Sequence, residues 1–106
     1  MNKIVTADDN SFISEILQSS TPVLVDFSAS WCAPCHRLSS ILEEFSKTSE
    51  LKIVKVDVDD APEMSVKYGI RGVPTLMLFK DGINVDTKIG FISLVELNNF
   101  VSKIAL

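Results

Sequence analysis

The stretch Trp31-Cys32-Ala33-Pro34-Cys35-His36 contains both cysteines of the chain, together with its only tryptophan and its only histidine. Two thiols at positions i and i+3 lie on one face of a helix, close enough to form a small disulfide ring with little movement of the backbone. A ring closed over so few residues removes little entropy from the unfolded chain and adds little stability. The pair therefore predicts a reversible two-electron switch rather than a structural crosslink.

The length and composition set limits on the fold and on its partners. A chain of 106 residues predicts one domain, residues 1–106, with a single core. The net charge is −4 and the basic residues form no run, so neither nucleic acid nor an anionic membrane is expected as a partner. Because the sequence shows no apolar stretch of signal-peptide or membrane-spanning length, we expect a cytoplasmic protein.

The segment before the cysteines is an apolar run of strand length, Val23–Phe27, interrupted by Asp26. Continuous apolarity is typical of a central strand that is covered on both faces. An ionised carboxylate is costly in such surroundings, so burial predicts a raised pKa for Asp26, unless this acid points to solvent at a strand end. Further upstream, Ile4-Val5 predicts a short strand, followed by a helix capped by Asp8, Asp9 or Asn10 with apolar positions at Phe12, Ile13, Ile16 and Leu17.

The segment after the cysteines alternates between helix and strand patterns. Leu38, Ile41, Leu42 and Phe45 have helical spacing, and Pro34 fits the first turn of that helix. A strand over 51–58 and a short helix from Pro62 to Gly69 follow. This alternation predicts parallel strands with helical crossovers.

The last third of the chain predicts an antiparallel hairpin and a helix. Strands over 75–79 and 85–89 are joined through Asp81-Gly82, a strong signal for a tight turn. Apolar residues of the final helix are Leu94, Leu97, Val101 and Ile104. The pattern as a whole predicts an α/β fold around a mixed sheet.

Several motifs in this order resemble the thioredoxin family over essentially the full chain: Val25-Asp26-Phe27, Trp31-Cys32-Ala33-Pro34-Cys35, Tyr68-Gly69-Ile70-Arg71-Gly72-Val73-Pro74-Thr75 and Gly82. The resemblance implies a three-layer thioredoxin fold with about five strands and four flanking helices. Three residues depart from the commonest family pattern. Ala33 stands where glycine is usual, His36 where lysine or arginine is common, and Ser28 where a second tryptophan is frequent.

The predicted activity is reduction of disulfides in partner proteins through a mixed disulfide. A helix N-terminus lowers the pKa of a thiol, so we expect Cys32 to be the accessible nucleophile and Cys35, one turn further on, the covered resolving cysteine. The resemblance implies that Asp26 serves the resolving thiol in proton transfer, through a water molecule in many members of the family. Lys55 could place its ammonium near Asp26, or simply extend to solvent.

The resemblance also implies a cis bond between Val73 and Pro74 and an apolar surface on which substrate segments lie. We expect this surface to comprise Trp31, Ala33, Pro34, Ile70, Gly72, Val73, Pro74 and Gly90. No bound cofactor or metal is expected, because regeneration would fall to a separate thioredoxin reductase that carries FAD and uses NADPH. The expected partners are this reductase and disulfide-containing proteins, and the expected state is a monomer.

Four alternatives remain at the level of sequence. A thioredoxin-like domain can act as an interaction module that works regardless of its redox state. The string from Cys32 to His36 also matches covalent haem attachment, with Met64 or Met77 as a distal ligand. Zinc is disfavoured because Cys32, Cys35 and His36 supply three ligands at most. The two cysteines could also be inert and buried.

Overall fold

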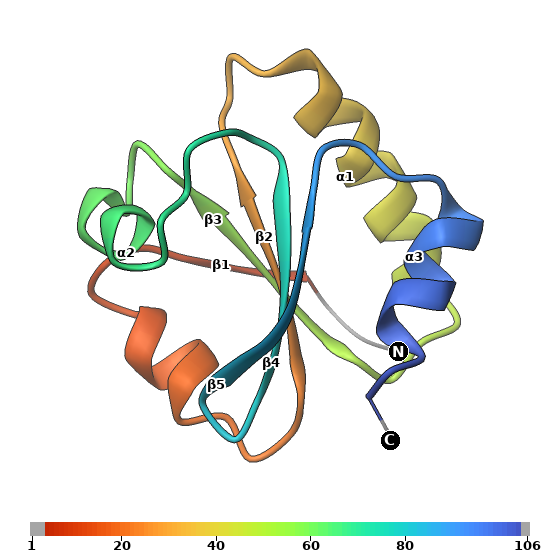
Figure 1. The fold of residues 1–106 in the computed structure, drawn as a ribbon, viewed down its shortest axis with the longest axis horizontal. Coiled ribbons are helices and arrows are strands. Elements are labelled where there is room, and N and C mark those ends of the chain that lie inside the picture. Colours follow the sequence, from red (N-terminus) through yellow and green to blue (C-terminus); the bar gives the residue numbers. More distant parts are fainter. Residues whose placement is uncertain (1–3, 105–106) are drawn as a thin grey trace.

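Five strands form one mixed sheet in the computed structural model, which describes residues 4–104 (Figure 1). Their order across the sheet is β1-β3-β2-β4-β5. The three strands of the first half are parallel, and β4 and β5 run antiparallel to their neighbours. The bounds are β1 Ile4–Ala7, β2 Val23–Ser28, β3 Lys52–Asp57, β4 Thr75–Lys80 and β5 Ile83–Ile89.

Helices cover both faces of this sheet. Figure 1 shows α1 and α3 on one side, and the red-orange first helix, η1, with α2 on the other. The bounds are η1 Ile13–Leu17, α1 Ala33–Ser46, α2 Pro62–Lys67 and α3 Leu94–Val101. The prediction of a three-layer α/β fold with five strands and four helices is therefore confirmed.

The sheet separates two apolar cores, and β2 contributes to both because successive side chains of a strand point to opposite faces. Leu24 packs with residues of α1 and α3, including Leu38 and Leu42. Val25 and Phe27 belong to the other core, beneath η1 and α2. By the same alternation Asp26 lies on the face of Leu24, which is the face covered by α1.

The first helix differs from the prediction, because η1 is a π-helix. The N–H of Gln18 donates to the carbonyl oxygen of Ile13, five residues earlier, at 2.8 Å. A π turn holds more residues than an α turn, so the expected α-helical stripe is not preserved. Phe12 and Ile16 are buried as predicted, whereas Ile13 is 47% exposed. Asp8 does cap the preceding turn, since its carboxylate accepts from the N–H of Ser11 at 3.0 Å.

The two predicted chain reversals are confirmed by backbone geometry. Asp81 and Gly82 have φ values of 54° and 77°, which the two-residue hairpin between β4 and β5 requires. Gly69, with φ of 67°, ends α2. Beyond Gly69 the N–H of Ile70 donates to the carbonyl oxygen of Ser65 at 2.9 Å. After this turn the chain runs from α2 to the Val73-Pro74 segment.

No helix within residues 4–104 is long and apolar enough to cross a membrane.

Candidate active site

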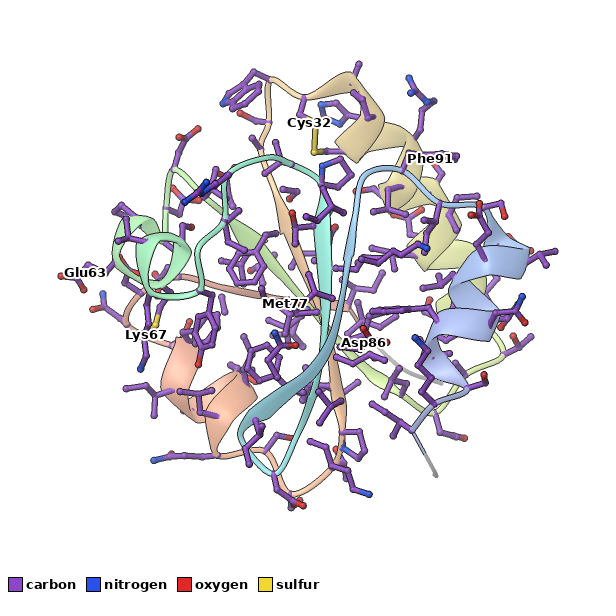
Figure 2. All side chains as sticks on the ribbon, in the orientation of Figure 1. Cys32, Glu63, Lys67, Met77, Asp86 and Phe91 are labelled. Atoms are coloured by element: carbon purple, nitrogen blue, oxygen red, sulfur yellow. A yellow bond between two sulfur atoms is a disulfide. The ribbon has the colours of Figure 1, made fainter. Side chains whose placement is uncertain are left out.

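The two cysteines form a disulfide at the N-terminus of α1. Cys32 is the N-cap residue of this helix, and Pro34 lies in its first turn. The N–H of Cys35 donates to the sulfur of Cys32 at 3.2 Å, and the two Cα atoms are 5.2 Å apart. Figure 2 shows the bond, labelled at Cys32, at the end of α1 that lies beyond the strands. The local sequence thus closes the ring within one helical turn.

The expected difference in exposure between the two cysteines is nearly absent, so the prediction of an accessible Cys32 is wrong for the disulfide form. Cys32 is 5% exposed and Cys35 is 2% exposed. Local packing covers both cysteines, because Ala29 and the partly buried Val73 pack with them in one small cluster.

The bond between Val73 and Pro74 is cis, which confirms the expectation. The sulfur of Cys32 lies 3.7 Å from the carbonyl oxygen of Val73. The N–H of Gly90 donates to the carbonyl oxygen of Pro74 at 2.9 Å, which joins the segment after β5 to this loop. Three segments that are far apart in the sequence therefore meet beside the disulfide.

The expected apolar surface is exposed to different degrees along its length. Trp31 is 70% exposed, as predicted, and its indole Nε1 donates to Asp59 Oδ2 at 3.1 Å. Ala33 and Gly72 are exposed, whereas Ile70, Val73, Pro34 and Gly90 are partly buried. Pro74 is buried, so it shapes this surface from below rather than presenting its ring to solvent. Pro74 directly precedes β4, whose first five residues are buried, and this position explains its burial.

Asp26 is completely buried in the middle strand of the sheet. Neither of its carboxylate oxygens has a hydrogen-bond partner among residues 4–104. Burial raises the pKa of Asp26 to about 7, and the positive charge of Lys55 opposes this rise. The predicted buried acid with a raised pKa is therefore confirmed, and the alternative of a solvent-facing acid is wrong.

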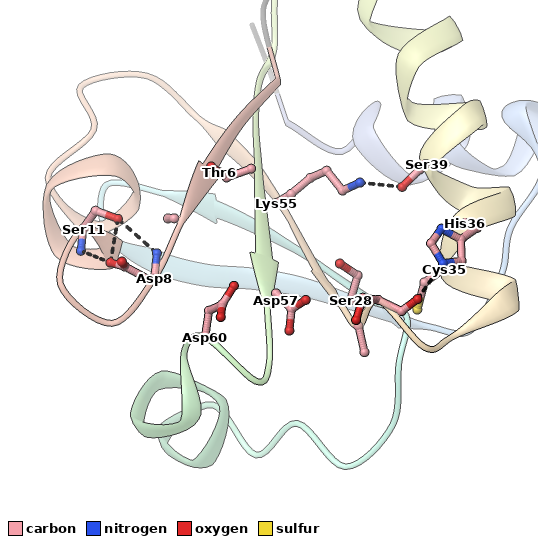
Figure 3. A pocket seen from close by; sticks show the side chains of 13 residues that line it. Thr6, Asp8, Ser11, Ser28, Cys35, His36, Ser39, Lys55, Asp57 and Asp60 are labelled. Carbon is pink, nitrogen blue, oxygen red and sulfur yellow. Dashed lines mark hydrogen bonds between the residues drawn. The ribbon is translucent and has the colours of Figure 1, made fainter.

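Lys55 is the β3 residue directly paired with Asp26, but its ammonium is bound elsewhere. Its Nζ donates to Ser39 Oγ at 2.5 Å, across the gap between β3 and α1 (Figure 3). Lys55 thus influences Asp26 through its charge rather than through a hydrogen bond. Ser39 was not among the predicted site residues, although it follows Cys35 by four residues and so shares its helical face.

A cleft of about 610 Å³ opens on the α1 side of the disulfide. Figure 3 shows Cys35, His36 and Ser39 of α1 on one wall, with Lys55 and Asp57 of β3 opposite. Cys35 is therefore reached from this polar cleft, while the surface with Trp31 lies beside Cys32. Sequence reasoning did not foresee the cleft, because it depends on the separation of α1 from the sheet.

His36 links the start of α1 to the segment that precedes the cysteines. Its Nε2 lies 2.7 Å from the carbonyl oxygen of Ser30, which can only accept, so the imidazole N–H is the donor. This bond fastens the backbone just before Trp31 and Cys32. The next residue, Arg37, places its guanidinium carbon 5.5 Å from the centre of the Phe91 ring.

The haem and zinc alternatives find no support in this geometry. Both cysteine sulfurs are joined to each other. Met77 and Met64 pack with the apolar core beneath η1 and α2, in a different cluster from the cysteines. Within residues 4–104 no three His, Cys, Asp or Glu side chains converge as metal ligands.

A redox-active Cys-x-x-Cys pair at a helix N-terminus, facing a cis-proline loop on a mixed α/β sheet, defines a thiol-disulfide oxidoreductase. The family model described as Thioredoxin matches residues 3–103, and the chain belongs to the thioredoxin family. It is 52% identical to a thioredoxin of Rickettsia bellii, with 86% of this chain and 92% of the relative covered. It is 42% identical to thioredoxin 1 of Synechococcus elongatus, with 97% and 98% covered. It is 43% identical to a thioredoxin of Pyropia yezoensis, with 90% of this chain and 91% of the relative covered.

Family membership and the disulfide together establish the activity. The chain is a protein-disulfide reductase that uses a dithiol-disulfide couple. Proteins of this family carry no cofactor of their own, and their general partners are disulfide-containing proteins and a thioredoxin reductase. The resemblance stated from the sequence motifs is therefore confirmed.

Proposed function

We propose that Cys32 is the attacking thiol and Cys35 the resolving thiol of this reductase. In the first step the Cys32 thiolate forms a bond with one sulfur of a substrate disulfide, and the other substrate sulfur leaves as a thiolate. Cys35 then attacks the Cys32 sulfur, which releases the second substrate thiol and restores the Cys32–Cys35 disulfide. Two electrons pass from the protein to the substrate.

The single observation that supports this order is the position of Cys32 as N-cap of α1, with the N–H of Cys35 aimed at its sulfur at 3.2 Å. A thiolate at a helix N-terminus is stabilised by such N–H groups and by the helix dipole, so its pKa is lowered. Cys35 lies one turn inside and is enclosed, which suits the thiol that acts second.

Asp26 is proposed as the group that takes up the proton of the Cys35 thiol during the second step. Its pKa of about 7 lets it change protonation state near neutral pH. Lys55 is proposed to tune this value, because its positive charge favours the ionised carboxylate. Both residues lie on the α1 side of the sheet, and Lys55 lines the same cleft as Cys35.

Substrate segments are proposed to lie on the surface formed by Trp31, Ala33, Pro34, Ile70, Gly72, Val73, Pro74 and Gly90. The carbonyl oxygen of Val73, 3.7 Å from the Cys32 sulfur, supports this, because an extended segment that pairs with it would bring its own sulfur to Cys32.

The remaining proposals concern the setting of the reaction. The chain acts as one domain, residues 1–106, and as a monomer in the cytoplasm, where a thioredoxin reductase carrying FAD and using NADPH restores the dithiol. The match of one family model to residues 3–103 supports the single domain.

Trapping of mixed disulfides tests the order of the two cysteines. A Cys35→Ser variant should accumulate a covalent complex with an oxidised peptide through Cys32, and this complex should disappear on treatment with dithiothreitol. The matched Cys32→Ser variant should trap little. Equal trapping by both variants, or trapping through Cys35 alone, would contradict the assignment.

The second candidate function is a redox-independent interaction module, which the exposed Trp31 surface would suit. A double variant, Cys32→Ser with Cys35→Ser, separates the two functions. If the double variant still supports the role of the protein in its host cell, the interaction module is favoured. Loss of that role favours catalysis.

A further inference from the structure

An arginine and an aromatic ring form a pair at the border of the proposed substrate surface. The guanidinium carbon of Arg37 lies 5.5 Å from the centre of the Phe91 ring. Arg37 follows Cys35 by two residues, and Phe91 follows Gly90, which is bonded to Pro74. Figure 2 shows Phe91 beside α1, at the same end of the molecule as Cys32. Through Gly90, which Phe91 follows, the pair therefore borders the proposed substrate surface.

The backbone under both side chains is rigidly held. Leu38 and Ile92, the residues that follow Arg37 and Phe91, are 0% and 2% exposed and belong to the same core cluster. The Phe91 ring itself is 43% exposed. The two side chains thus rest on fixed positions of α1 and of the segment after β5, and they present an outward-facing surface.

Among the residues that the structure describes, the Arg37 guanidinium has no acidic partner. The ion pairs within residues 4–104 all involve lysines: Lys47 with Glu44, Lys52 with Glu15, and Lys103 with Asp86. A guanidinium stacked on an aromatic face keeps its N–H edge free for a carboxylate, and the ring restricts its movement before binding. On a chain of net charge −4, this local positive group is the feature that would attract an acidic segment.

Other charged groups near the site do not substitute for this pair. Asp59, on the opposite border, is already bound to the indole of Trp31. His36 is bonded to the Ser30 carbonyl on the cleft side. Arg71 precedes Gly72 in an exposed loop, and within the described residues its guanidinium does not lie over an aromatic ring. Lys67 and Lys103 also lie over aromatic rings, those of Tyr68 and Phe100, but among these charged groups near the site Arg37 is the cation that lies over a ring.

We propose that Arg37 and Phe91 form a specificity subsite that binds an Asp or Glu side chain of the substrate protein, a few residues from the cysteine under attack. The carboxylate accepts two N–H bonds from the guanidinium, and the stem of the acidic side chain lies over the exposed ring. A lysine at the same place meets a like charge and is rejected. This inference rests on the proposed function, because it extends the same substrate surface.

The test measures how fast the reduced protein reduces disulfide-linked peptide dimers. Each peptide has one cysteine and one variable residue, Glu, Gln or Lys, placed in turn at each of the three positions on either side of the cysteine. The readout is the ratio of the second-order rate constants for the Glu and Lys peptides, taken within each protein variant. General changes in reactivity cancel in this ratio.

For the wild-type protein we expect the Glu peptide to react about two to five times faster than the Lys peptide at one of these positions, as for a partly exposed charge pair. The ratio should approach one at high salt. Arg37→Gln should bring it near one, and Arg37→Glu should invert it. Phe91→Leu, which removes the ring but keeps an apolar side chain, should reduce it in part.

Lys47→Gln is the matched control, because it makes the same change in net charge at the far end of α1. It should retain the wild-type ratio. A wild-type ratio near one at every position, or an unchanged ratio in Arg37→Gln, would overturn the subsite. Failure of the wild-type protein to reduce even the Gln peptide would instead overturn the proposed function, so the two failures are distinct.

Discussion

Asp26 and Lys55 are direct neighbours in the parallel register of β2 and β3, yet the ammonium of Lys55 is hydrogen-bonded to Ser39 on α1. Both carboxylate oxygens of Asp26 are left without a hydrogen-bond partner among residues 4–104. The acid is therefore buried next to a positive charge that is oriented away from it. This arrangement keeps the pKa of Asp26 raised to about 7.

The first prediction concerns stability and pH. Because the pKa of Asp26 rises from 3.8 to about 7 on folding, the folded protein holds a proton that the unfolded chain has lost between these values. Stability from this group is full below the unfolded value and is lost as the pH rises through the folded value. A shift of this size corresponds to about 4 kcal/mol.

Asp26→Asn should remove this loss of stability at higher pH. Chemical unfolding of the oxidised proteins should show similar stability of variant and wild type near about pH 4, and a more stable variant above about pH 8, by up to about 4 kcal/mol. The exposed acid Glu43 provides a control, since Glu43→Gln should follow the wild-type curve. Parallel curves for Asp26→Asn and wild type would contradict the predicted linkage.

The second prediction concerns the pH dependence of catalysis. If Asp26 takes up a proton in the resolving step, the rate of disulfide reduction should titrate with a group near its pKa of about 7. Asp26→Asn should abolish that inflection while leaving the fold intact. The measurement is a pH–rate profile with one peptide disulfide. An unchanged pH–rate profile in the variant would show that Asp26 does not take part in the proton transfer.

The third prediction separates the charge of Lys55 from its hydrogen bond. Lys55→Met should raise the pKa of Asp26 further, because the lysine charge lowers it. Ser39→Ala should have the opposite effect, because it frees the ammonium to approach the carboxylate. The carboxyl carbon of Asp26, followed by NMR during a pH titration, reports both changes. Shifts of the same sign in the two variants would contradict this account.

The fourth prediction compares three glycines. A Cβ at Gly82 would lie 2.8 Å from the backbone oxygen of Leu17, and its φ is +77°. Gly69 has φ of +67° with open space around it, and Gly72 has neither constraint. Alanine at Gly69 should cost about 1 kcal/mol of unfolding free energy, more at Gly82, and less than about 0.5 kcal/mol at Gly72. Equal costs at Gly82 and Gly72, measured by urea unfolding, would contradict this ranking.

The fifth prediction concerns Asp9, which holds the start of α2 from a distant part of the chain. Its two carboxylate oxygens accept from the N–H groups of Glu63 and Met64, each at 3.0 Å. Asp9→Ala should destabilise the protein by about 1–2 kcal/mol, as does the loss of a helix cap. Glu43→Ala, which removes an exposed acid, should cost less than about 0.5 kcal/mol. Similar midpoints in urea unfolding for the two variants would argue against the cap.

Much of the site could be predicted because its signals are local in the sequence. The apolar run around Asp26 predicts burial and hence a raised pKa. The Asp81-Gly82 pair predicts the hairpin, since both residues need positive φ. The spacing of Cys32 and Cys35, with Pro34 between them, places the disulfide in the first turn of a helix.

The features that were missed depend on contacts between distant segments. The bond from Lys55 to Ser39 requires the distance between β3 and α1, and the contact of Arg37 with Phe91 requires the packing of α1 against the segment after β5. The low exposure of Cys32 depends on Val73, far along the chain. The sequence predicts an α-helix at η1 because the buried Ile16 and the buried N-cap residue Phe12 are four residues apart, which is also α-helical spacing.

Trp31 is the only tryptophan of the chain, it is largely exposed, and it is adjacent to Cys32 and tethered to Asp59. The protein therefore contains one indole fluorophore, located beside the disulfide that opens and closes during turnover. Since the emission of an indole depends on its immediate surroundings, reduction of the disulfide should change this signal without an added label. The fluorescence of Trp31 thus reports the oxidation state of the protein.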